Sequence, residues 1–595
     1  MNSITVLHTP SREYVCPTDR NRLSIKLLCK SERMTDCQVV FWNRFYPDGV
    51  KTAEMICVSR DAEFDHFLCE LVFDETVKYI KYYFVIHAAR KCRYLGRDGL
   101  GGEKPETFYE YLWSNENDIF RVPQWAKGAV IYQIFPDRFN NGDPLNDPDG
   151  TVEWNSIPTR GNFFGGDLKG ILLKLDYLQD LEIDAIYLNP LFKAPSNHKY
   201  DTTDYYTIDP SYGGIDDLIE LIKQCHKQNI KVILDGVFNH CGYPFEPFQD
   251  VLRNGESSRY RDWFSIDSFP VQTDPPNYEC VGYYKWMPKL RFDNPVVRRY
   301  FLDVGTYWLK IADIDGWRLD VADEVDFTFW QEFRQAIKSV KKDALLIAET
   351  WKDGRDMLRG DQMDSVMNYL LRDSLVEYFA LESIDTIQFN HLIQRMLFLY
   401  PGIVYPVLYN LIGSHDTPRF LELCGGSLQK MQLAVVFQMT FPGMPAIYYG
   451  DESGLTGEND PDCRKSMNWE NPNKDLLMFY KTIIAIRKKS PSLLYGDFRC
   501  ICCENAIYAY ARHLENKTAY IVLNKGKSDK HLSIPLFEAL SEIAELKSVL
   551  NDTVYKPKPI ETGDCFYQSD MNRYRSKVEL VLQAHHFEIM KAGGR

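Results

Sequence analysis

Eight short apolar runs, each followed by a longer segment of helical periodicity, are the feature that most constrains the fold of this chain. The runs extend from GAVIYQIF at residues 128–135 to GMPAIYYGDE at residues 443–452. One intervening segment has apolar residues at the three- and four-residue spacing of a helix face, namely Leu218, Ile219, Ile222 and Cys225. Continuous apolar strands that alternate with helices are typical of a parallel sheet covered outside by helices. Eight such units predict a (β/α)8 TIM barrel in the α/β class.

Two all-β segments flank the predicted barrel, which occupies residues 123–490. Residues 1–122 contain short alternating apolar stretches such as DCQVVFW and YIKYYFVIHA, a pattern that favours a β-sandwich. Residues 491–595 contain similar stretches such as TAYIVLNKG, which predict a second all-β domain of the sandwich type. The interval after the third barrel strand is unusually long and rich in Pro, Tyr and Trp. We therefore expect an inserted subdomain at about residues 241–292, over the barrel mouth.

Composition limits the partners that the chain can have. Its 595 residues include 69 Lys and Arg against 83 Asp and Glu, a net charge of −14, which leaves no broad basic surface for nucleic acid phosphates. No uncharged run approaches the ~20 residues that cross a bilayer, and the N-terminus lacks the pattern of a secretory signal. We therefore expect a cytoplasmic protein that binds neither nucleic acid nor membrane.

The cysteines do not indicate a metal or a disulfide framework. Fifteen are scattered along the chain without recurring CxxC pairs, so we expect reduced thiols. Cys500, Cys502 and Cys503 could suggest a metal site, but the strand-like alternation around them favours ordinary packing.

Three carboxylates stand at or just beyond the ends of predicted strands: Asp320 in GWRLD, Glu349 in LLIAET and Asp416 in GSHDT. The carboxyl ends of barrel strands meet at one cavity, and like charges held close raise the pKa of one carboxyl so that it can act as an acid. Glycoside hydrolysis needs two such carboxyls. A helix N-cap explains any single one about equally well. It explains the whole group poorly, because other polar residues gather at the same ends, namely Arg318, His240 and His415.

Several motifs resemble those of a known enzyme family. Four ordered segments resemble the signature regions of α-amylase-type glycoside hydrolases: DGVFNH (235–240), GWRLDVADE (316–324), AETW (348–351) and GSHDT (413–417). Three more narrow the resemblance to the neopullulanase, cyclomaltodextrinase and maltogenic amylase subgroup: HKYD (198–201), MPKL (287–290) and FPGMPAIYYGDE (441–452). The resemblance covers nearly the whole chain, since the two flanking β-domains fit the same layout.

The resemblance implies the chemical roles of the first two carboxylates. Asp320 would be the nucleophile that attacks the anomeric carbon of an α-linked glucose, and Arg318 would keep it ionised and oriented. Glu349 would protonate the leaving oxygen and then activate water. Two successive inversions would retain the configuration at the anomeric carbon.

The resemblance also implies which residues contact the sugar. Asp416 would grip the 2- and 3-hydroxyls, while His415 and His240 would donate hydrogen bonds to the same ring. Tyr200 would stack beneath that ring, with core packing as the alternative.

Four further contacts are expected along the cleft. Trp351 would stack on a sugar on the leaving-group side, and Glu324 would lie near the acceptor site. Asp460 and Arg464 would contact sugars deeper in the cleft, although a surface salt bridge explains this pair nearly as well.

A loop after the first barrel strand carries candidate calcium ligands. The segment FNNGDPLNDPDG sets hard oxygen donors close together, which suits calcium better than zinc. An Asx-rich turn explains the same residues about equally well. The resemblance favours a structural calcium site in which a GGDL segment completes the shell. The expected ligands are Asn141, Asp143, Asn146, Asp147, the Gly165 carbonyl and Asp167.

These expectations define a retaining α-glucan hydrolase. It would cleave α-1,4 bonds in cyclodextrins, maltooligosaccharides, pullulan or starch, with some transglycosylation and no organic cofactor. The alternatives are a carbohydrate-binding scaffold without chemistry, or an α-glucan transferase or isomerase. The resemblance further implies that the N-terminal domain is starch-binding-like and forms a homodimer by leaning over the active site of a second copy.

Overall fold

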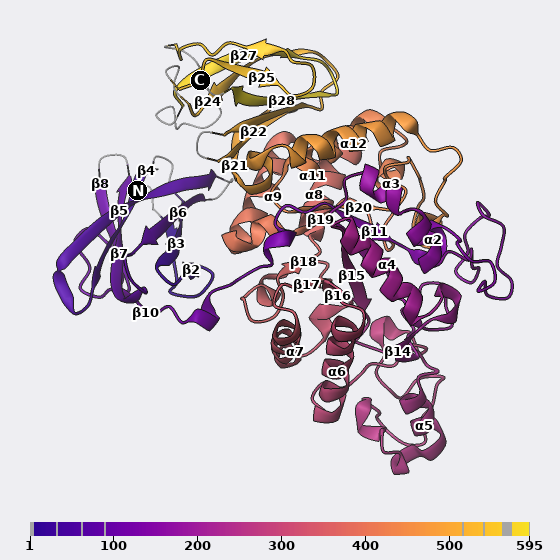
Figure 1. Ribbon diagram of the computed structural model, residues 1–595. Coiled ribbons are helices and arrows are strands. Elements are labelled where there is room, and N and C mark those ends of the chain that lie inside the picture. The colour runs from indigo at the N-terminus through magenta and orange to yellow at the C-terminus, as the bar shows by residue number, and fades with distance from the viewer. Residues whose placement is uncertain are drawn as a thin grey trace.

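An eight-stranded parallel sheet occupies the middle of the chain in the computed structural model (Figure 1). The strand order is β18-β17-β16-β15-β12-β11-β20-β19, and a parallel bridge between Met367 and Tyr409 brings the two outer strands together in a nearly closed barrel. The strands are β11 (Ile131–Ile134), β12 (Ala185–Leu188), β15 (Lys231–Gly236), β16 (Gly316–Leu319), β17 (Leu345–Ala348), β18 (Ser365–Val366), β19 (Tyr409–Leu411) and β20 (Met444–Tyr448). The structure describes residues 5–30, 34–60, 64–88, 91–514, 517–538, 542–561 and 574–593.

Burial on both faces explains why the apolar runs form barrel strands. Every residue of β11, β12, β16 and β17 is buried, as expected for a parallel sheet with helices outside and side chains inside. The main covering helices are α3 (Leu175–Asp180), α4 (Ile215–Lys227), α6 (Pro295–Ile311), α7 (Phe327–Val340), α9 (Thr386–Leu399), α11 (Leu428–Thr440) and α12 (Lys474–Lys488). In α4, Leu218, Ile222 and Cys225 are buried as expected, whereas Ile219 is only partly buried and Leu221 lies inward instead. The predicted barrel is confirmed.

The N-terminal domain is a β-sandwich whose two sheets share one long strand. Its strands are β1 (Thr5–Leu7), β2 (Val15–Asp19), β3 (Arg22–Lys30), β4 (Met34–Asn43), β5 (Tyr46–Arg60), β6 (Asp65–Val72), β7 (Lys78–Ala88), β8 (Lys91–Gly96), β9 (Gly99–Gly101) and β10 (Tyr109–Trp113). The strand β5 pairs with β4 in one sheet and with β6 in the other. The core between the sheets includes Leu23, Ile25, Val39 and Phe84.

The inserted segment lies between β15 and α6 and projects from the barrel, away from both flanking domains (Figure 1). It contains α5 (Glu246–Asn254), short 3-10 turns and isolated bridges such as His240 with Lys289 and Phe264 with Leu290. Phe248 packs against Phe264 and Tyr278 to form its small apolar core.

The predicted C-terminal domain, residues 491–595, begins with a short helix, α13 (Pro491–Tyr495), and is built of strands from β21 onward. It packs on the barrel through α11 and β21. Its strands are β21 (Asp497–Glu504), β22 (Ile507–His513), β23 (Ala519–Asn524), β24 (Lys530–Leu536), β25 (Glu545–Ser548), β26 (Val554–Tyr555), β27 (Ser576–Leu582) and β28 (His586–Gly593). Four parts of the predicted domain lie outside the described residues, namely 515–516, 539–541, 562–573 and 594–595. Cys500, Cys502 and Cys503 lie in β21, and every cysteine among the described residues is free. Within the described ranges, none of the helices has the length and apolarity to cross a membrane.

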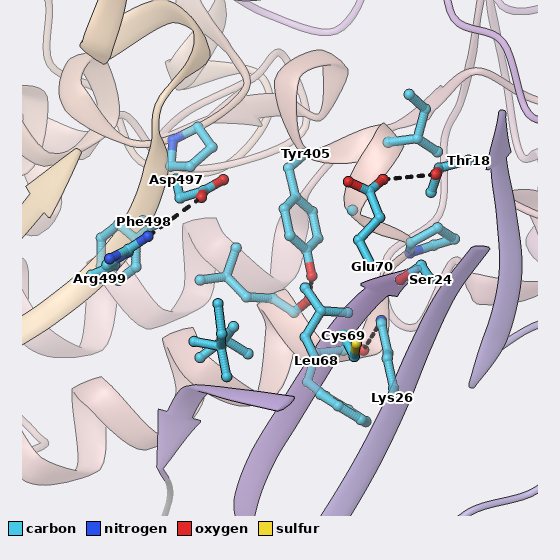
Figure 2. Close-up of a pocket in the computed structure, with 18 of the residues that line it drawn as sticks. Thr18, Ser24, Lys26, Leu68, Cys69, Glu70, Tyr405, Asp497, Phe498 and Arg499 are labelled. Carbon is cyan, nitrogen blue, oxygen red and sulfur yellow. Dashed lines mark hydrogen bonds and ion pairs between the residues drawn. The ribbon is translucent and has the colours of Figure 1, made fainter. Parts of the chain in front are cut away.

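A cavity of about 740 Å³ separates the N-terminal domain, the barrel and the C-terminal domain (Figure 2). Ser24, Lys26 and Glu70 line it on the N-terminal side, Tyr405 on the barrel side and Phe498 on the C-terminal side. No predicted catalytic residue lines it, so this cavity is distinct from the predicted active site.

Lys26 joins two of these domains across the cavity wall. It is only 8% exposed, and its Nζ donates hydrogen bonds to the carbonyl oxygens of Phe398 and Tyr400, at 3.1 Å each. Both carbonyls belong to the C-terminal end of α9, which carries partial negative charge. Lys26 therefore links β3 of the sandwich to the barrel helix α9 through hydrogen bonds.

Replacing Lys26 with Met tests how the ionisation of this buried amine affects stability. Burial lowers the pKa of Lys26 to about 8, whereas a lysine in an unfolded chain titrates near about 10.4. Between these pH values the unfolded chain binds more protons than the folded one. The contribution of Lys26 to the free energy of unfolding therefore rises with pH, by at most about 1.4 kcal/mol per pH unit. Thermal unfolding from about pH 7 to about pH 10 should show the native chain gaining stability relative to Lys26→Met.

The exposed residue Lys51 in β5 offers a matched control. If the stability difference between the native chain and Lys26→Met stays constant with pH, or if Lys51→Met shows the same pH dependence, Lys26 does not titrate as inferred.

Candidate active site

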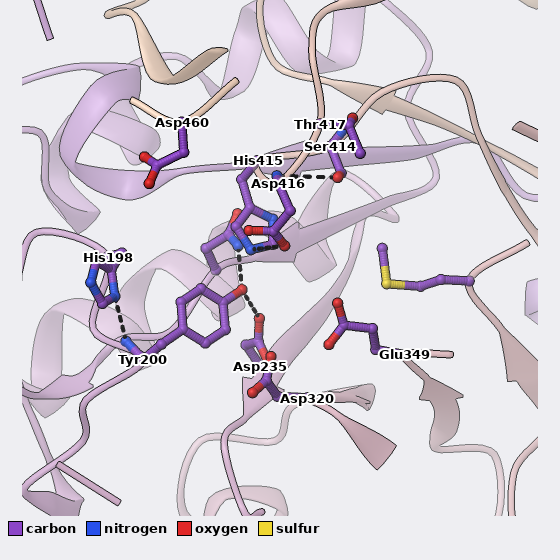
Figure 3. Close-up of polar contacts among 12 residues, drawn as sticks. His198, Tyr200, Asp235, Asp320, Glu349, Ser414, His415, Asp416, Thr417 and Asp460 are labelled. Atoms are coloured by element: carbon purple, nitrogen blue, oxygen red, sulfur yellow. Dashed lines mark hydrogen bonds and ion pairs between the residues drawn. The ribbon is translucent and has the colours of Figure 1, made fainter. Parts of the chain in front are cut away.

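Three carboxylates meet at one edge of the barrel. Asp320 and Glu349 directly follow β16 and β17, and Asp416 lies in the turn after β19. Because these strands are parallel, their carboxyl ends lie at the same edge of the sheet. Figure 3 shows the three side chains around a common space, with Tyr200 on the opposite side. The structure thus brings together the three residues predicted to be catalytic.

Arg318 is the charged centre of this edge. It is fully buried, and it lies on the same face of β16 as Asp320 because residues two apart in a strand share a face. Its Nη1 donates to Asp320 Oδ1 at 2.7 Å and to Asp235 Oδ1 at 2.9 Å. Its Nη2 lies 2.9 Å from Glu349 Oε2. One guanidinium therefore contacts three carboxylates, and its contact with Glu349 is an ion pair without hydrogen-bond geometry.

Asp320 and Glu349 form a buried pair with side chains 7% and 5% exposed. Burial and the neighbouring Glu349 carboxylate raise the pKa of Asp320 well above its usual range, while the Arg318 guanidinium acts in the opposite direction. Retaining glycoside hydrolysis requires an ionised nucleophile beside an acid. The contact with Arg318 is what favours the ionised form of Asp320 against burial and the neighbouring carboxylate.

Asp416 differs from this pair because it is 29% exposed and has its own hydrogen-bond donors. Its Oδ2 lies 2.9 Å from His415 Nε2, and its Oδ1 accepts from Arg464 Nη2 at 3.1 Å. Gln133 Nε2 donates to His415 Nδ1 at 2.9 Å, which leaves the imidazole proton on Nε2, facing Asp416. Burial acts to raise the pKa of Asp416, but these contacts hold it below its usual range. Asp416 is therefore an anion in the site.

The Tyr200 ring forms a flat wall of the site (Figure 3). It lies parallel to the His415 ring, with centroids 5.2 Å apart and planes 4° apart. Its hydroxyl donates to Asp235 Oδ2 and accepts from Asn189 Nδ2, both at 2.8 Å. Tyr200 is only partly buried, so part of its ring remains accessible to a ligand.

His240 lies beside Tyr200 with both ring nitrogens engaged. Its Nε2 donates to the Tyr200 carbonyl at 3.1 Å, and its Nδ1 lies 3.5 Å from Asn239 Nδ2. Burial lowers the pKa of His240 to about 4, so the ring is neutral. A hydrogen bond from His240 to a sugar would therefore compete with the carbonyl of Tyr200.

Asp235 has a central place in the site that the sequence analysis did not assign to it. It is 1% exposed at the end of β15. Both of its carboxylate oxygens accept from Arg318 Nη1, and Oδ2 also accepts from the hydroxyls of Tyr187 and Tyr200. The sequence could have indicated this role, because Asp235 is the first residue of the DGVFNH segment, at a strand end. Tyr187 carried no such signal, since it lies inside an ordinary apolar run of β12.

Trp351 and Glu324 lie on the outer part of the edge. Trp351 is 46% exposed and stacks on Tyr369, with centroids 4.2 Å apart and planes 12° apart. Glu324 Oε2 accepts from Lys289 Nζ at 3.0 Å and from Asn239 Nδ2 at 3.3 Å. Because Lys289 belongs to the MPKL segment, this contact ties the inserted segment to the barrel edge.

Arg464 and Asp460 form more than a surface salt bridge. Arg464 has only 10% of its side chain exposed, and its Nη1 lies 3.0 Å from Asp460 Oδ1. Its Nε also donates to the His415 carbonyl at 2.8 Å, beside the contact with Asp416. The pair therefore supports the turn that carries His415 and Asp416.

The candidate calcium loop folds around the carboxylate of Asp167. This carboxylate accepts from the backbone N–H groups of Gly142, Asp143 and Gly170 and from Asn146 Nδ2. Asn141 Nδ2 donates to Asp147 Oδ1 at 2.8 Å, beside Gly165.

Two amide oxygens in this loop, Asn141 Oδ1 and Asn146 Oδ1, are buried without a hydrogen-bond partner. Such oxygens fit a hard cation. Across the described residues, no three His, Cys, Asp or Glu side chains cluster as metal ligands, so a cation here would need amide and carbonyl oxygens beside its carboxylates.

Comparison with known proteins places this geometry in a family. Residues 133–475 match the model of the α-amylase catalytic domain, and residues 1–115 match that of the α-amylase N-terminal Ig-like domain. The chain is 42% identical to a cyclomaltodextrinase of Thermoanaerobacter pseudethanolicus, over 91% of this chain and 96% of that protein. It is also 42% identical to neopullulanase 2 of Thermoactinomyces vulgaris, over 87% and 90%.

Two further matches agree with these. An intracellular maltogenic amylase of Bacillus subtilis is 37% identical, over 90% of this chain and 93% of that protein. A solved cyclomaltodextrinase structure superimposes with a TM-score of 0.91 at 36% identity, covering 99% of each chain. The chain therefore belongs to the α-amylase family of glycoside hydrolases, within the group that contains cyclomaltodextrinases, neopullulanases and maltogenic amylases.

Proposed function

We propose that this protein is a retaining hydrolase of α-1,4-glucosidic bonds in cyclodextrins, maltooligosaccharides, pullulan or starch, with transfer to a second sugar as a side reaction. The observation that carries the proposal is the meeting of Asp320, Glu349 and Asp416 at the carboxyl edge of the barrel, where Arg318 contacts the first two and His415 and Arg464 contact the third. The names of the relatives support the substrate class, since cyclomaltodextrinases and neopullulanases act on α-glucans.

In the first step, an Asp320 oxygen forms a bond to the anomeric carbon as the bond from that carbon to the leaving oxygen breaks. The proton of the Glu349 carboxyl passes to the leaving oxygen. In the second step, the Glu349 carboxylate takes a proton from water, whose oxygen attacks the same carbon and releases Asp320. Arg318 holds Asp320 in its attacking orientation and favours its ionised form before attack and after release.

The neighbouring residues would hold the sugar at the reacting carbon. Asp416, kept ionised by His415 and Arg464, accepts hydrogen bonds from ring hydroxyls. The accessible part of the Tyr200 ring supports the apolar face of that sugar. Trp351 provides a second ring surface on the leaving-group side.

Replacing Asp320 with Asn should lower maltose release from β-cyclodextrin by about 10⁵-fold or more, because the covalent route loses its nucleophile. The substitution keeps the size of the side chain, so thermal unfolding should confirm a folded protein. Asp356→Asn, at a side chain 59% exposed in the loop after β17, is the matched control and should retain activity. Undiminished turnover by the Asp320 variant would refute the proposed mechanism.

We also propose a structural calcium ion in the loop after β11. Asn141, Asn146, Asp143, Asp147 and the Gly165 carbonyl would hold it, and the buried free oxygens of the two Asn residues support this set. Burial and the neighbouring carboxylates of Asp167 and Asp143 raise the pKa of Asp147, a repulsion that a cation would relieve. Asp167 already accepts four hydrogen bonds, so its contribution to the shell would require one to be displaced.

If calcium binds in this way, removing it with a chelator should lower the thermal unfolding temperature. Calcium at ~100 times its Kd stabilises a folded protein by about 2.7 kcal/mol. Asp147→Asn should abolish the response and the binding heat, whereas Asp176→Asn, at an exposed position on α3, should not. An unfolding temperature that ignores both calcium and chelator would exclude the site.

We propose that the protein is a cytoplasmic homodimer formed through its N-terminal domain. The similarity to an intracellular maltogenic amylase of Bacillus subtilis supports the location. An exposed aromatic cluster supports the interface: Phe45, Tyr46 and Trp113 are 60%, 73% and 44% exposed, and Tyr79 lies between Phe45 and Trp113. Exposed apolar clusters of this kind mark interaction sites on folded proteins.

Light scattering should therefore give about twice the chain mass of 69.4 kDa at micromolar concentration. Tyr46→Ser should shift the particles towards the monomer, because Tyr46 is the most exposed ring of this cluster and large aromatic side chains often carry much of the binding energy of an interface. Particles of the chain mass alone for the native protein would contradict the dimer.

A further inference from the structure

The inserted segment carries an exposed aromatic turn that the catalytic mechanism does not use. Within residues 282–286, Tyr283 is 98% exposed, Tyr284 63% and Trp286 54%. Single exposed apolar residues are common, but three large rings in one short turn are not, and folded proteins keep such groups for binding.

The backbone of this turn is held in an unfavourable conformation. Gly282 and Tyr283 have φ values of 51° and 66°, and a bulky residue such as tyrosine rarely adopts the left-handed region. Three hydrogen bonds enforce the shape: Tyr284 N–H to the Val281 carbonyl, Met287 N–H to the Tyr284 carbonyl and Val281 N–H to the Met287 carbonyl. Strain that is enforced in this way tends to accompany a binding role, and here it keeps the Tyr283 ring in solvent.

The same turn is directly connected to the catalytic edge. Lys289 bridges His240 in antiparallel register, Cys241 N–H donates to the Pro288 carbonyl, and Tyr243 N–H donates to the Trp286 carbonyl. At ~3.3 Å per residue, this short ladder places Trp286 about 10 Å from the level of His240. A chain of sugars that leaves the catalytic edge along the ladder would meet the aromatic turn.

Trp286 is oriented before any ligand binds. Its ring meets Tyr243 edge to face, with centroids 5.1 Å apart and planes 78° apart. Lys285 Nζ lies 5.1 Å from the centre of the same ring and also 3.2 Å from Asp274. The lysine charge is thus neutralised locally, and the turn presents ring faces without a net charge, as a neutral sugar chain requires.

We propose that residues 282–286 form an outer sugar-binding platform, on which Tyr283, Tyr284 and Trp286 stack against glucose rings of an α-glucan that extends beyond the catalytic edge. The proposal rests on the proposed function. A second copy of this chain is the competing occupant, but the rings lie beside exposed Asp274 and Glu279, a small and partly charged surface for a protein interface.

Steady-state kinetics with short and long substrates tests the platform. Tyr283→Ser and Trp286→Ser should leave kcat/KM for maltotriose within about twofold of the native value. For maltoheptaose they should lower kcat/KM roughly tenfold through KM, equivalent to about 1.4 kcal/mol of lost binding. Tyr495→Ser, at a half-exposed tyrosine that ends α13 (Pro491–Tyr495), is the matched control and should change neither.

A binding measurement separates this inference from the catalytic proposal. In the Asp320→Asn background, maltotriose reports on Trp351 at the catalytic edge, and maltoheptaose should quench tryptophan fluorescence further; Trp286→Phe should remove this additional quenching and leave the maltotriose signal unchanged. Equal losses for both substrates, or no loss for either, would overturn the platform. If light scattering shows that Tyr283→Ser dissociates a dimer, the turn is a protein interface instead. If native protein does not hydrolyse α-glucans but still shows the fluorescence change, the proposed function fails and the platform stands.

Discussion

The buried contacts of Arg318 are the interaction on which the rest of the site depends. One guanidinium meets Asp235, Asp320 and Glu349 inside a barrel whose surrounding strands are fully buried. Removing charges from water costs several kcal/mol per ion, and the attraction offsets this only when geometry and hydrogen bonds are good. The rigid ends of β15, β16 and β17 supply that geometry. Burial and the carboxylates of Glu349 and Asp235 raise the pKa of Asp320, and Arg318 acts against them.

In this arrangement the buried carboxyls and the partly exposed carboxylate have different functions. Asp320 and Glu349 share a dry site in which a proton can be held and passed on, whereas Asp416 keeps its charge through His415 and Arg464. The two environments are separate, because the partners of Asp416 come from the turn after β19 and the loop after β20. A carboxylate that binds hydroxyls must stay ionised while its neighbours change protonation, and separate partners make this possible.

The sequence predicted what depends on periodicity and strand ends. All eight barrel strands follow the apolar runs, and Asp320, Glu349 and Asp416 lie where parallel strand ends converge. It could not predict contacts that arise only when distant segments meet. The hydroxyl of Tyr187 reaches Asp235 from a neighbouring strand, and Arg464 reaches the carbonyl of His415 across 49 residues of sequence. Neither contact leaves a local pattern.

The ring surfaces outside the catalytic edge are built differently from the edge itself. Each of its ring surfaces is attached to a loop: Trp351 stacks on Tyr369 after β17, and Trp286 rests on Tyr243 in the inserted segment. Loops tolerate substitution better than barrel strands, because fewer buried contacts constrain them. The Lys289 contact with Glu324 joins the inserted segment to the edge near Asp320, so a change in the insertion can alter which sugars reach the edge while Arg318 and its carboxylates stay in place. Bond cleavage and chain recognition can therefore vary independently in this fold.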